Sequence, residues 1–283
     1  MKVSVLDKGY VSLAETNLGT IGISPIMGSD LSPVNAARAS FMKASQQLNE
    51  ADIRLLDFLA REAHTSPYRH ATVTIEVKAP FMIARQWFKY RVGWEHGPDT
   101  AELVGVAVPK EIAPTVFDFL KAAVQWLPLG ADQFREFPIT ARNEASRRYV
   151  TLEPEWYVPG PTEWRSAPEN MKQGSGEPLP ADKGHALTHM LKVNIQDGML
   201  AYNAAMAQGL APEMARGFLP SMYFMYTVWR WTASLQGVAF FISERTKHDA
   251  QDEITQYAYA VWDLIRPYFK HSLDKLLGEN TRG

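Results

Sequence analysis

One strictly alternating segment, TVTIEVK at 72–78, limits most strongly what this chain can fold into. Its three apolar residues would lie on one face of a strand and its polar residues on the other. This is the pattern of a strand with one buried face and one face in water. Pro80 ends the alternation, and Phe81–Arg91 has helical character. The segment therefore predicts a half-buried strand that leads directly into a helix.

Helical patterns dominate the rest of the chain. A second short strand is expected at Lys2–Leu6, where apolar and polar residues again alternate. We expect a helix at Asn35–Phe41, with Ser32 as its cap and Pro33 in its first turn, and a second helix that Asn49 caps. Further helices are expected at Asp182–Ala207, from Pro212 onward, and at Asp249–Leu277, the last with a break near Pro267. Few strands among many helices predict an α+β fold, with 1–283 as one continuous domain.

Two regions differ from this pattern. Residues 92–142 contain loop signals and one apolar helix, predicted at Val116–Trp126, so this region has the character of an inserted, lid-like segment. Residues 154–180 contain six prolines and are expected to be rich in loops. Loops this long in a compact domain are usually functional or disordered, and the first region is too apolar to be disordered.

Composition excludes several classes of protein. Apolar residues make up 46% of the chain, which is enough for a substantial core. The net charge is −2, from 29 basic and 31 acidic residues, so a protein that coats nucleic acid is not expected. No apolar run approaches the roughly 18 residues that span a bilayer, and the N-terminus does not resemble a signal peptide. We therefore expect a cytoplasmic protein with no membrane partner.

The absence of cysteine restricts the chemistry. The chain has 0 cysteines, which removes thiol nucleophiles, thiolate metal sites and iron–sulfur clusters. Catalysis must use hydroxyl, carboxylate, imidazole or amine groups, or a bound cofactor. His185 and His189 have the spacing of helical metal ligands, but no third ligand accompanies them. No metal site is expected.

Three segments are dense in polar groups, and each has two interpretations. Ala84–Arg91 (ARQWFKYR) has the pattern of an amphipathic helix with a basic edge. In Arg142–Tyr149 (RNEASRRY), a glutamate and an arginine lie four residues apart; they could form a helical ion pair or line a turn that binds an anion. Ser243–Glu253 (SERTKHDAQDE) is expected to open the last helix, as a solvated cap or as a phosphate site. Singly, none identifies an enzyme.

Taken in order, these and other short blocks resemble the flavin-dependent thymidylate synthase (ThyX) family over nearly the whole chain. The blocks are MKVSVLDKGYV at the start, Gly28–Phe41, His64–Arg91, NEASRRY (Asn143–Tyr149), WYVP (Trp156–Pro159), KQGS (Lys172–Ser175), GLAPEMARGFLP (Gly209–Pro220) and RTKHDAQDEITQYA (Arg245–Ala258). The lack of cysteine is consistent with this resemblance, because the other class of thymidylate synthase uses a thiolate.

The resemblance implies a fold with a small, mostly antiparallel sheet packed against several long helices. It also implies a homotetramer with active sites at subunit interfaces, in which FAD takes hydride from NADPH. The implied reaction is C5 methylation of a uridine monophosphate, with methylenetetrahydrofolate as the carbon donor. In such an enzyme the cofactors carry the difficult chemistry, and the protein binds and orients them.

The resemblance assigns roles by position. Residues implied to bind the nucleotide substrate are Gln86, Glu144, Ala145, Ser146, Arg148, Arg216 and Arg245, of which Arg245, Glu144 and Ser146 are the expected catalytic residues. Residues implied to bind the flavin are Ser40, Ser66, Lys89, Tyr90, Arg91, Glu144, Ser234, Gln236 and Asp249. His64 and Tyr149 are expected near the folate or the flavin edge. Arginine suits phosphate because its planar guanidinium forms paired charged hydrogen bonds.

The departures from the family pattern are specific. Where the family's defining block begins Arg-His-Arg, this chain has Lys89-Tyr90-Arg91. Asn143 follows Arg91 by 52 positions instead of five, so about 47 residues are inserted inside the block. At three positions around the cofactor, this chain replaces the family's usual Asn, Arg and His with Ser234, Gln236 and Asp249. The nucleotide half of the pattern is kept, and the flavin half is changed.

These departures favour a divergent member that methylates dUMP, UMP or both. They resemble the UMP/dUMP C5-methylase of polyoxin-type nucleoside-antibiotic pathways more than a standard family member. A housekeeping thymidylate synthase that is strict for dUMP remains an alternative, as does hydroxymethylation of the same base. A third alternative is a non-catalytic protein that has kept the nucleotide site and lost the flavin.

Overall fold

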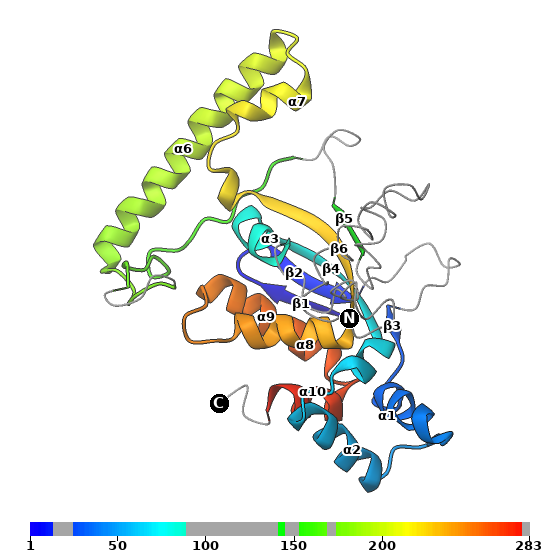
Figure 1. Cartoon of the computed structure of the whole chain (residues 1–283). Coiled ribbons are helices and arrows are strands. Elements are labelled where there is room, and N and C mark those ends of the chain that lie inside the picture. The colour runs from blue at the N-terminus through cyan, green and yellow to red at the C-terminus, as the bar shows by residue number, and fades with distance from the viewer. Residues whose placement is uncertain (14–24, 89–140, 145–152, 169–173, 279–283) are drawn as a thin grey trace, which may run out of the picture.

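The computed structural model describes residues 1–13, 25–88, 141–144, 153–168 and 174–278 of the 283-residue chain (Figure 1). It shows a central antiparallel sheet with helices against it and a long helical arm that extends to one side. The expected α+β fold with an antiparallel sheet is confirmed. Within the described part of the chain, no helix is long and apolar enough to cross a membrane.

Within the described residues, the sheet has six strands in the order β1-β2-β4-β6-β5, and β3 pairs with β4 beside this path. The strands are β1 (Lys2–Val5), β2 (Gly9–Leu13), β3 (Ile26–Met27), β4 (Thr72–Pro80), β5 (Ala141–Glu144) and β6 (Tyr226–Ser234). The central pair, β4 and β6, runs in antiparallel register along nine residues, with Ile75 opposite Trp231 and Val77 opposite Trp229. The alternating pattern of 72–78 is confirmed as a strand with one buried face.

The helices are α1 (Leu31–Arg38), α2 (Glu50–Arg61), α3 (Phe81–Phe88), α6 (Ala181–Ala207), α7 (Pro212–Ala215), α8 (Leu235–Arg245), α9 (Asp252–Ile265) and α10 (Lys270–Leu277). Four short 3-10 helices join them: η1 (Ala39–Phe41), η2 (Ser66–His70), η3 (Arg216–Phe218) and η4 (Met222–Phe224). The long helix expected at Asp182–Ala207 is confirmed as α6. Pro212 also begins a helix as expected, although α7 has only 4 residues.

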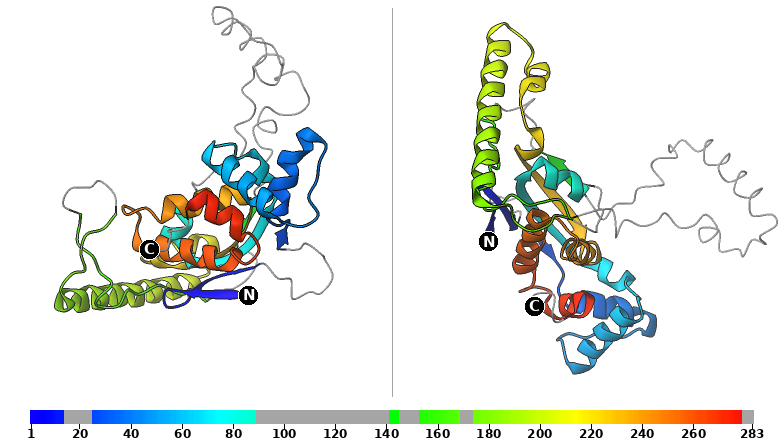
Figure 2. Two further views of the ribbon diagram at one scale, coloured as in Figure 1. Left: turned by 90° about the horizontal axis from the view of Figure 1, so that it is seen from below. Right: turned by 90° about the vertical axis from the view of Figure 1, so that its left-hand side faces the viewer.

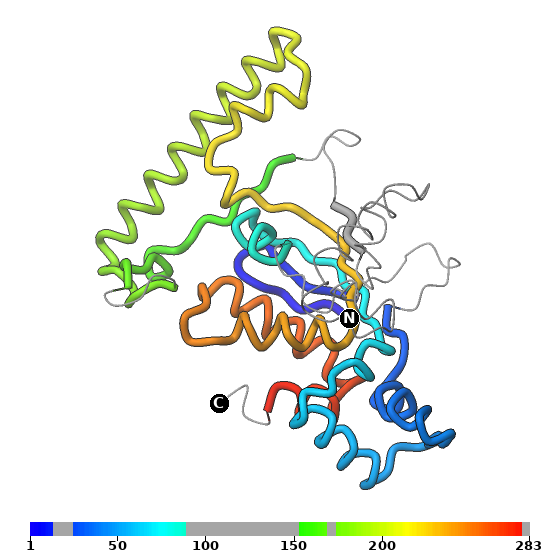
Figure 3. Tube along the Cα trace, in the orientation of Figure 1, coloured from blue at the N-terminus to red at the C-terminus, as the bar shows by residue number. Residues whose placement is uncertain are grey.

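Helices α8 and α9 pack on the buried face of the sheet: α8 contacts β4 and β6, and α9 contacts β1 and β2. The trace in Figure 3 shows the consequence, since the first strands of the chain lie beside one of its last helices. The core between them includes Val73, Trp229, Phe241 and Val261, all at most 1% exposed. Burial of this apolar surface is the main source of the fold's stability.

Two helix caps were predicted from the sequence, and one of them is wrong. Asn49 caps α2 as expected, because its side chain accepts hydrogen bonds from the backbone N–H groups of Ala51 and Asp52. Helix α1, however, begins at Leu31, so Ser32 lies inside the helix. The Oγ of Ser32 accepts from the backbone N–H of Ser29 instead.

The expected helix at Asp249–Leu277 is two helices, α9 and α10, with the break near Pro267 confirmed. Its expected start is wrong, because residues 246–251 form a turn and α9 begins at Asp252. Arg245 therefore does not open the last helix. It is the final residue of α8, a helix that the sequence patterns did not reveal.

Helices α6 and α7 form an arm that extends away from the sheet in all three ribbon views (Figures 1 and 2). A small apolar cluster of Trp156, Leu219 and Met225 anchors it, and the indole of Trp156 donates to the backbone carbonyl of Pro220 at 3.1 Å. Large apolar side chains on the arm and the turns after it are exposed, among them Met190, Leu200, Met214 and Tyr223, at 60% or more. The arm thus presents an extended apolar surface.

The inserted segment 92–142 and its expected helix Val116–Trp126 lie outside the described residues, except for the last two residues of the segment, which begin β5. The loop-rich character expected for 154–180 agrees with the described parts of that stretch. They contain only isolated bridges, such as Arg165 with Pro178.

Candidate active site

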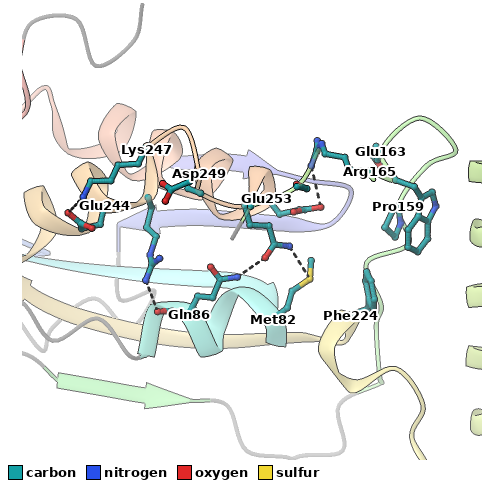
Figure 4. A pocket seen from close by; sticks show the side chains of 16 residues that line it. Met82, Gln86, Pro159, Glu163, Arg165, Phe224, Glu244, Lys247, Asp249 and Glu253 are labelled. Carbon is teal, nitrogen blue, oxygen red and sulfur yellow. Dashed lines mark hydrogen bonds and ion pairs between the residues drawn. The ribbon is translucent and has the colours of Figure 1, made fainter. Parts of the chain in front are cut away.

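A cleft of about 510 Å³ lies between α3, the turn that joins α8 to α9, and the loop around 159–165 (Figure 4). Gln86 and Met82 line it from α3, and Arg245 and Gln251 line it from the opposite side. Its volume lies within the range of small-molecule sites in proteins. The cleft is the candidate active site because it contains residues that the sequence analysis selected independently.

Helix α3 is fixed in place by an aromatic cluster beneath it. The buried ring of Trp87 stacks on Phe241 with centroids 4.1 Å apart, and contacts Trp229 and Trp231 edge-on at 5.4 and 5.5 Å. Such pairs add to the stability that burial itself provides. Gln86, the neighbour of Trp87, is therefore carried on a helix that has little freedom to move.

Arg245 is held at the end of α8 by two contacts. Its Nη2 donates to the backbone carbonyl of Gln86 at 3.4 Å. Its own backbone carbonyl accepts from the hydroxyl of Thr255 at 2.8 Å, which connects the end of α8 to α9. The guanidinium is partly exposed and lines the cleft, so it can donate to an anionic or carbonyl oxygen of a ligand.

A chain of side-chain contacts crosses the cleft floor. Gln86 donates from Nε2 to Oε1 of Gln251 at 2.6 Å. Gln251 in turn donates from Nε2 to the sulfur of Met82 at 3.6 Å. These two contacts are drawn as dashed lines in Figure 4. They determine the orientation of both amides.

Ion pairs hold the two outer sides of the cleft. Arg165 reaches from the loop to the first turn of α9, with Nη2 2.8 Å from Asp252 and Nη1 3.9 Å from Glu253. On the other side, Lys247 pairs with Glu244 at 2.6 Å. Because the Arg165 side chain is only 23% exposed, its pair is better protected from solvent than the Lys247 pair, which is about half exposed.

A second group of expected ligand residues lies on η1, around η2 and at the start of α8. Ser40, His64 and Ser66 are exposed on η1, on the segment before η2 and on η2. At the start of α8, the amide of the buried Gln236 accepts from Nε of Arg69 and donates to the hydroxyl of Thr65, both at 2.6 Å.

Ser234 is also buried in this second group. Its hydroxyl accepts from the backbone N–H of Gly237 and caps the N-terminus of α8. Ser234 and Gln236 thus already have partners within the chain, whereas Ser40, His64 and Ser66 lie on the surface. The second group combines a buried polar base with an exposed polar surface.

The structure brings together some of the predicted site residues. Gln86, Arg245 and Asp249 line the cleft. Ser234 and Gln236 lie at the opposite end of α8 from Arg245, about 15 Å away along an 11-residue helix. Arg216 lies on η3, which packs against α6, and is not among the residues that line the cleft. Among the described residues predicted to bind the nucleotide, Arg216 is therefore separate from Gln86 and Arg245.

Several predicted site residues lie outside the described part of the chain. They are Lys89, Tyr90, Arg91, Ala145, Ser146, Arg148 and Tyr149. Glu144 is described by its backbone, which lies in β5 opposite Trp229 of β6.

Sequence reasoning missed most of the residues that line the cleft, among them Met82, Arg165 and Gln251. Gln251 and Met82 lie within blocks that carried the resemblance, so their position along the chain was a usable signal. Arg165 lies among the prolines of a loop-rich stretch, where no pattern marks it. Among the residues that the structure describes, no three His, Asp or Glu side chains gather as metal ligands.

Comparison with known families resolves the identity of this arrangement. The family profile described as "Thymidylate synthase complementing protein" matches residues 23–96 and 126–269, which include both the cleft and the second group. The chain belongs to this family. The gap between the two matched ranges falls within the inserted segment 92–142, so the insertion is a departure from the family pattern.

Relatives of this family member confirm the assignment over most of the chain. A flavin-dependent thymidylate synthase of Thermus thermophilus is 30% identical over 266 residues, covering 94% of this chain and 74% of the relative. That of Anaplasma marginale is 29% identical over 265 residues, covering 94% and 70%. The expectation of a divergent family member, and of an enzyme of the methyltransferase type, is confirmed.

A solved structure shares the fold. The UMP/dUMP methylase PolB from Streptomyces cacaoi, bound with 5-Br UMP, superposes with a TM-score of 0.66 at 18% identity, covering 96% of this chain and 95% of that one. The same methylase bound with 5-Br dUMP gives the same TM-score at 19% identity. The sheet, the helices packed on it and the long arm are thus a known architecture.

Proposed function

We propose that this protein is an FAD-dependent methylase that transfers a one-carbon unit to C5 of uracil in dUMP, UMP or both. Methylenetetrahydrofolate would supply the carbon, and NADPH the reducing equivalents. The observation that carries the proposal is the meeting of Gln86 and Arg245 in one cleft. Both residues were selected by position in a family whose curated relatives are flavin-dependent thymidylate synthases.

The cleft suits the base of a nucleotide. Uracil presents carbonyl oxygens and an N3–H group on one edge. Arg245 supplies donors that can bind a carbonyl oxygen and stabilise charge that develops on it. Gln86 supplies an amide that can bind the neighbouring ring position. Arg245, Glu144 and Ser146 are the proposed catalytic residues, and Ala145 would complete the nucleotide contacts.

The second group of residues fits a flavin nucleotide. Exposed hydroxyls of Ser40 and Ser66 can donate to pyrophosphate or ribose oxygens, and Arg69, held by Gln236, adds a positive charge beside them. When bound, FAD would supply the hydride chemistry. We propose that Lys89, Tyr90, Arg91, Glu144 and Asp249 also contribute to flavin binding. Ser234 and Gln236 would then shape the site from beneath, and His64 and Tyr149 would lie at its folate edge.

The separation of these residues supports a site shared between subunits. Arg216 is proposed to bind substrate phosphate together with Arg148, yet Arg216 lies on η3, which packs against the arm, and not in the cleft. The arm also exposes Met190, Leu200 and Met214 at 64% or more. Apolar surface of this kind is characteristic of interfaces. A homotetramer in which each arm brings Arg216 to a neighbour's cleft would satisfy both observations.

Substrate choice is proposed to be relaxed. The insertion lies within the block that the family uses at the nucleotide and the flavin edge, so we propose that it changes that boundary. A wider or differently closed boundary can admit the 2′-OH of ribose, which a tight pocket excludes because a buried hydroxyl without a partner is unfavourable. We therefore expect methylation of UMP beside dUMP.

The test uses the purified protein loaded with FAD. A yellow protein that methylates dUMP and UMP with methylenetetrahydrofolate and NADPH is the expected result. Full activity with dUMP and strict rejection of UMP would favour the alternative, an ordinary thymidylate synthase. A protein that stays colourless with added FAD but binds UMP would overturn the enzymatic proposal in favour of a nucleotide-binding protein.

A further inference from the structure

The orientation of the Gln86 side chain is determined by a residue that has no assigned role. An amide can present either its oxygen or its NH₂ group to a ligand, and rotation by half a turn exchanges the two. The direct partner of Gln86 is Gln251, whose amide has the same ambiguity. The pair alone therefore does not decide which atom of Gln86 faces a ligand.

Met82 removes this ambiguity. A thioether sulfur accepts hydrogen bonds and has no hydrogen to donate. The Gln251 atom that lies 3.6 Å from the Met82 sulfur must therefore be the NH₂ group. The oxygen of Gln251 then points to Gln86, so Gln86 must donate from its own NH₂ group, at 2.6 Å. The reversed arrangement would place the Gln251 oxygen against the sulfur, with two lone pairs facing each other.

The oxygen of Gln86 is left as the atom that this amide offers to a ligand. Among the described residues, no donor contacts Oε1 of Gln86, although Gln86 lines the cleft. Beside it, Arg245 presents N–H donors and is tied to the backbone of the same residue. The cleft thus presents an acceptor next to donors, in a fixed order.

We propose that Gln251 is a positioning residue that makes the site selective for uracil over cytosine. This inference rests on the proposed function, because it takes the ligand to be a pyrimidine nucleotide. The N3 atom of uracil carries a hydrogen, which the oxygen of Gln86 can accept. The N3 atom of cytosine carries a lone pair, which would face that oxygen. Sites built around such a hydrogen bond reject the mismatched ligand strongly.

The experiment compares binding of UMP and CMP to the FAD-loaded protein by calorimetry, so that the result does not depend on turnover. Wild type should bind UMP more tightly. In Gln251→Leu the Gln86 amide can rotate, and the ratio of the two dissociation constants should fall at least about tenfold. The side chain of Gln251 makes no cap hydrogen bond at the start of α9, so this variant retains the helix cap.

Two further variants separate positioning from general damage. Gln251→Glu retains an oxygen that accepts from Gln86, although its second oxygen faces the Met82 sulfur. It should therefore keep the wild-type ratio even if the repulsion and the added charge weaken the binding of both nucleotides equally. Gln256→Leu makes the same chemical change one turn further along α9, where the amide is exposed and bonds Asp252. This control should also leave the ratio unchanged.

The outcomes are distinguishable. If wild type prefers UMP and Gln251→Leu keeps the full preference, or Gln251→Glu loses it, the inference is wrong while the proposed function stands. If wild type binds neither nucleotide, the proposed function fails, and the inference fails with it.

Discussion

The guanidinium of Arg245 donates to the backbone carbonyl of Gln86 across 159 positions of sequence, which joins the end of α8 to α3. The contact brings an arginine and an amide to one cleft from two helices that pack on the same aromatic cluster. Because both helices are anchored in the core, the relative placement of these side chains is built into the fold.

Replacing Arg245 should remove activity and leave the flavin bound. Arg245→Ala deletes the donors that face the proposed substrate, and losing one such donor typically lowers kcat by about 10²–10³-fold. The proposed flavin surface lies at the other end of α8, so the flavin absorbance of the purified variant should match wild type. Steady-state kinetics measure the loss of activity, and the absorbance spectrum measures the bound flavin. A near-normal rate would show that Arg245 has been assigned the wrong role.

A mixed oligomer tests whether the site is shared. Arg216→Ala and Arg245→Ala should each be inactive alone. If Arg216 of one subunit completes the cleft of another, random mixing of equal amounts restores a complete site in about one combination of four. Activity of about a quarter of wild type is therefore expected after the subunits are dissociated and reassembled together. If activity does not recover although light scattering confirms reassembly, then either both arginines belong to the site of one chain or Arg216 has no role in the site.

Gly184 should be intolerant of a side chain. A Cβ at this position of α6 would lie 1.7 Å from the carbonyl oxygen of Pro161, so the loop that reaches the cleft would have to move. Overpacking of this kind costs about 1–3 kcal/mol, which outweighs the gain of about 0.5–1 kcal/mol for alanine over glycine in a helix. Thermal unfolding should show a lower midpoint for Gly184→Ala. Gly217→Ala is the matched control, because a Cβ there meets nothing within 4 Å; equal midpoints for the two would contradict the close approach.

The buried tyrosine Tyr226 should make the protein sensitive to alkali. Burial raises the pKa of Tyr226 far above its ordinary value of about 10, and the hydrogen bond to Asp7 at 2.6 Å raises it further. Between the ordinary and the raised pKa, the unfolded chain releases a proton that the folded protein keeps. The contribution to stability is therefore complete below about pH 10 and is lost as the pH rises.

Replacing Tyr226 by phenylalanine removes the contribution of this tyrosine to the pH dependence of stability. Above pH 10 the free energy of unfolding of wild type should fall more steeply than that of Tyr226→Phe, by up to about 1.4 kcal/mol per pH unit. Near neutral pH the variant should be less stable by about 1 kcal/mol, since it loses the hydrogen bond to Asp7. Urea unfolding from pH 7 to 11 measures both effects. Parallel pH curves for the two proteins would show that Tyr226 does not carry the alkaline sensitivity.

The sequence by itself determined the elements that depend on local pattern. Alternation at 72–78 predicted β4, the amide of Asn49 with a 3.6-residue apolar stripe predicted α2, and Asp182 after a proline-rich stretch predicted the long helix α6. Ordered polar blocks also identified the family, because short motifs survive where the rest of the chain diverges. Each helix or strand signal lies within a few residues, and the blocks are recognised by their order along the chain, so all of them can be read without knowing the fold.

Only the tertiary structure decided where the site residues lie. Helix α8 escaped prediction because it is buried on nearly all sides and so has no polar face to mark its period. Arg245 was consequently expected at the start of a helix, whereas it ends one. Strand β6 carries an alternation of tryptophans with Arg230 and Thr232 that could have revealed it.

The connection from Met82 through Gln251 to Gln86 spans 169 positions, and no local pattern contains it. It exists because α3 and the turn before α9 pack against the same core from different parts of the chain. Local propensity specifies a helix or a strand, but burial and hydrogen-bond partners are properties of the folded whole. The types of residue in the site were therefore readable from the sequence, and their orientation was settled by packing.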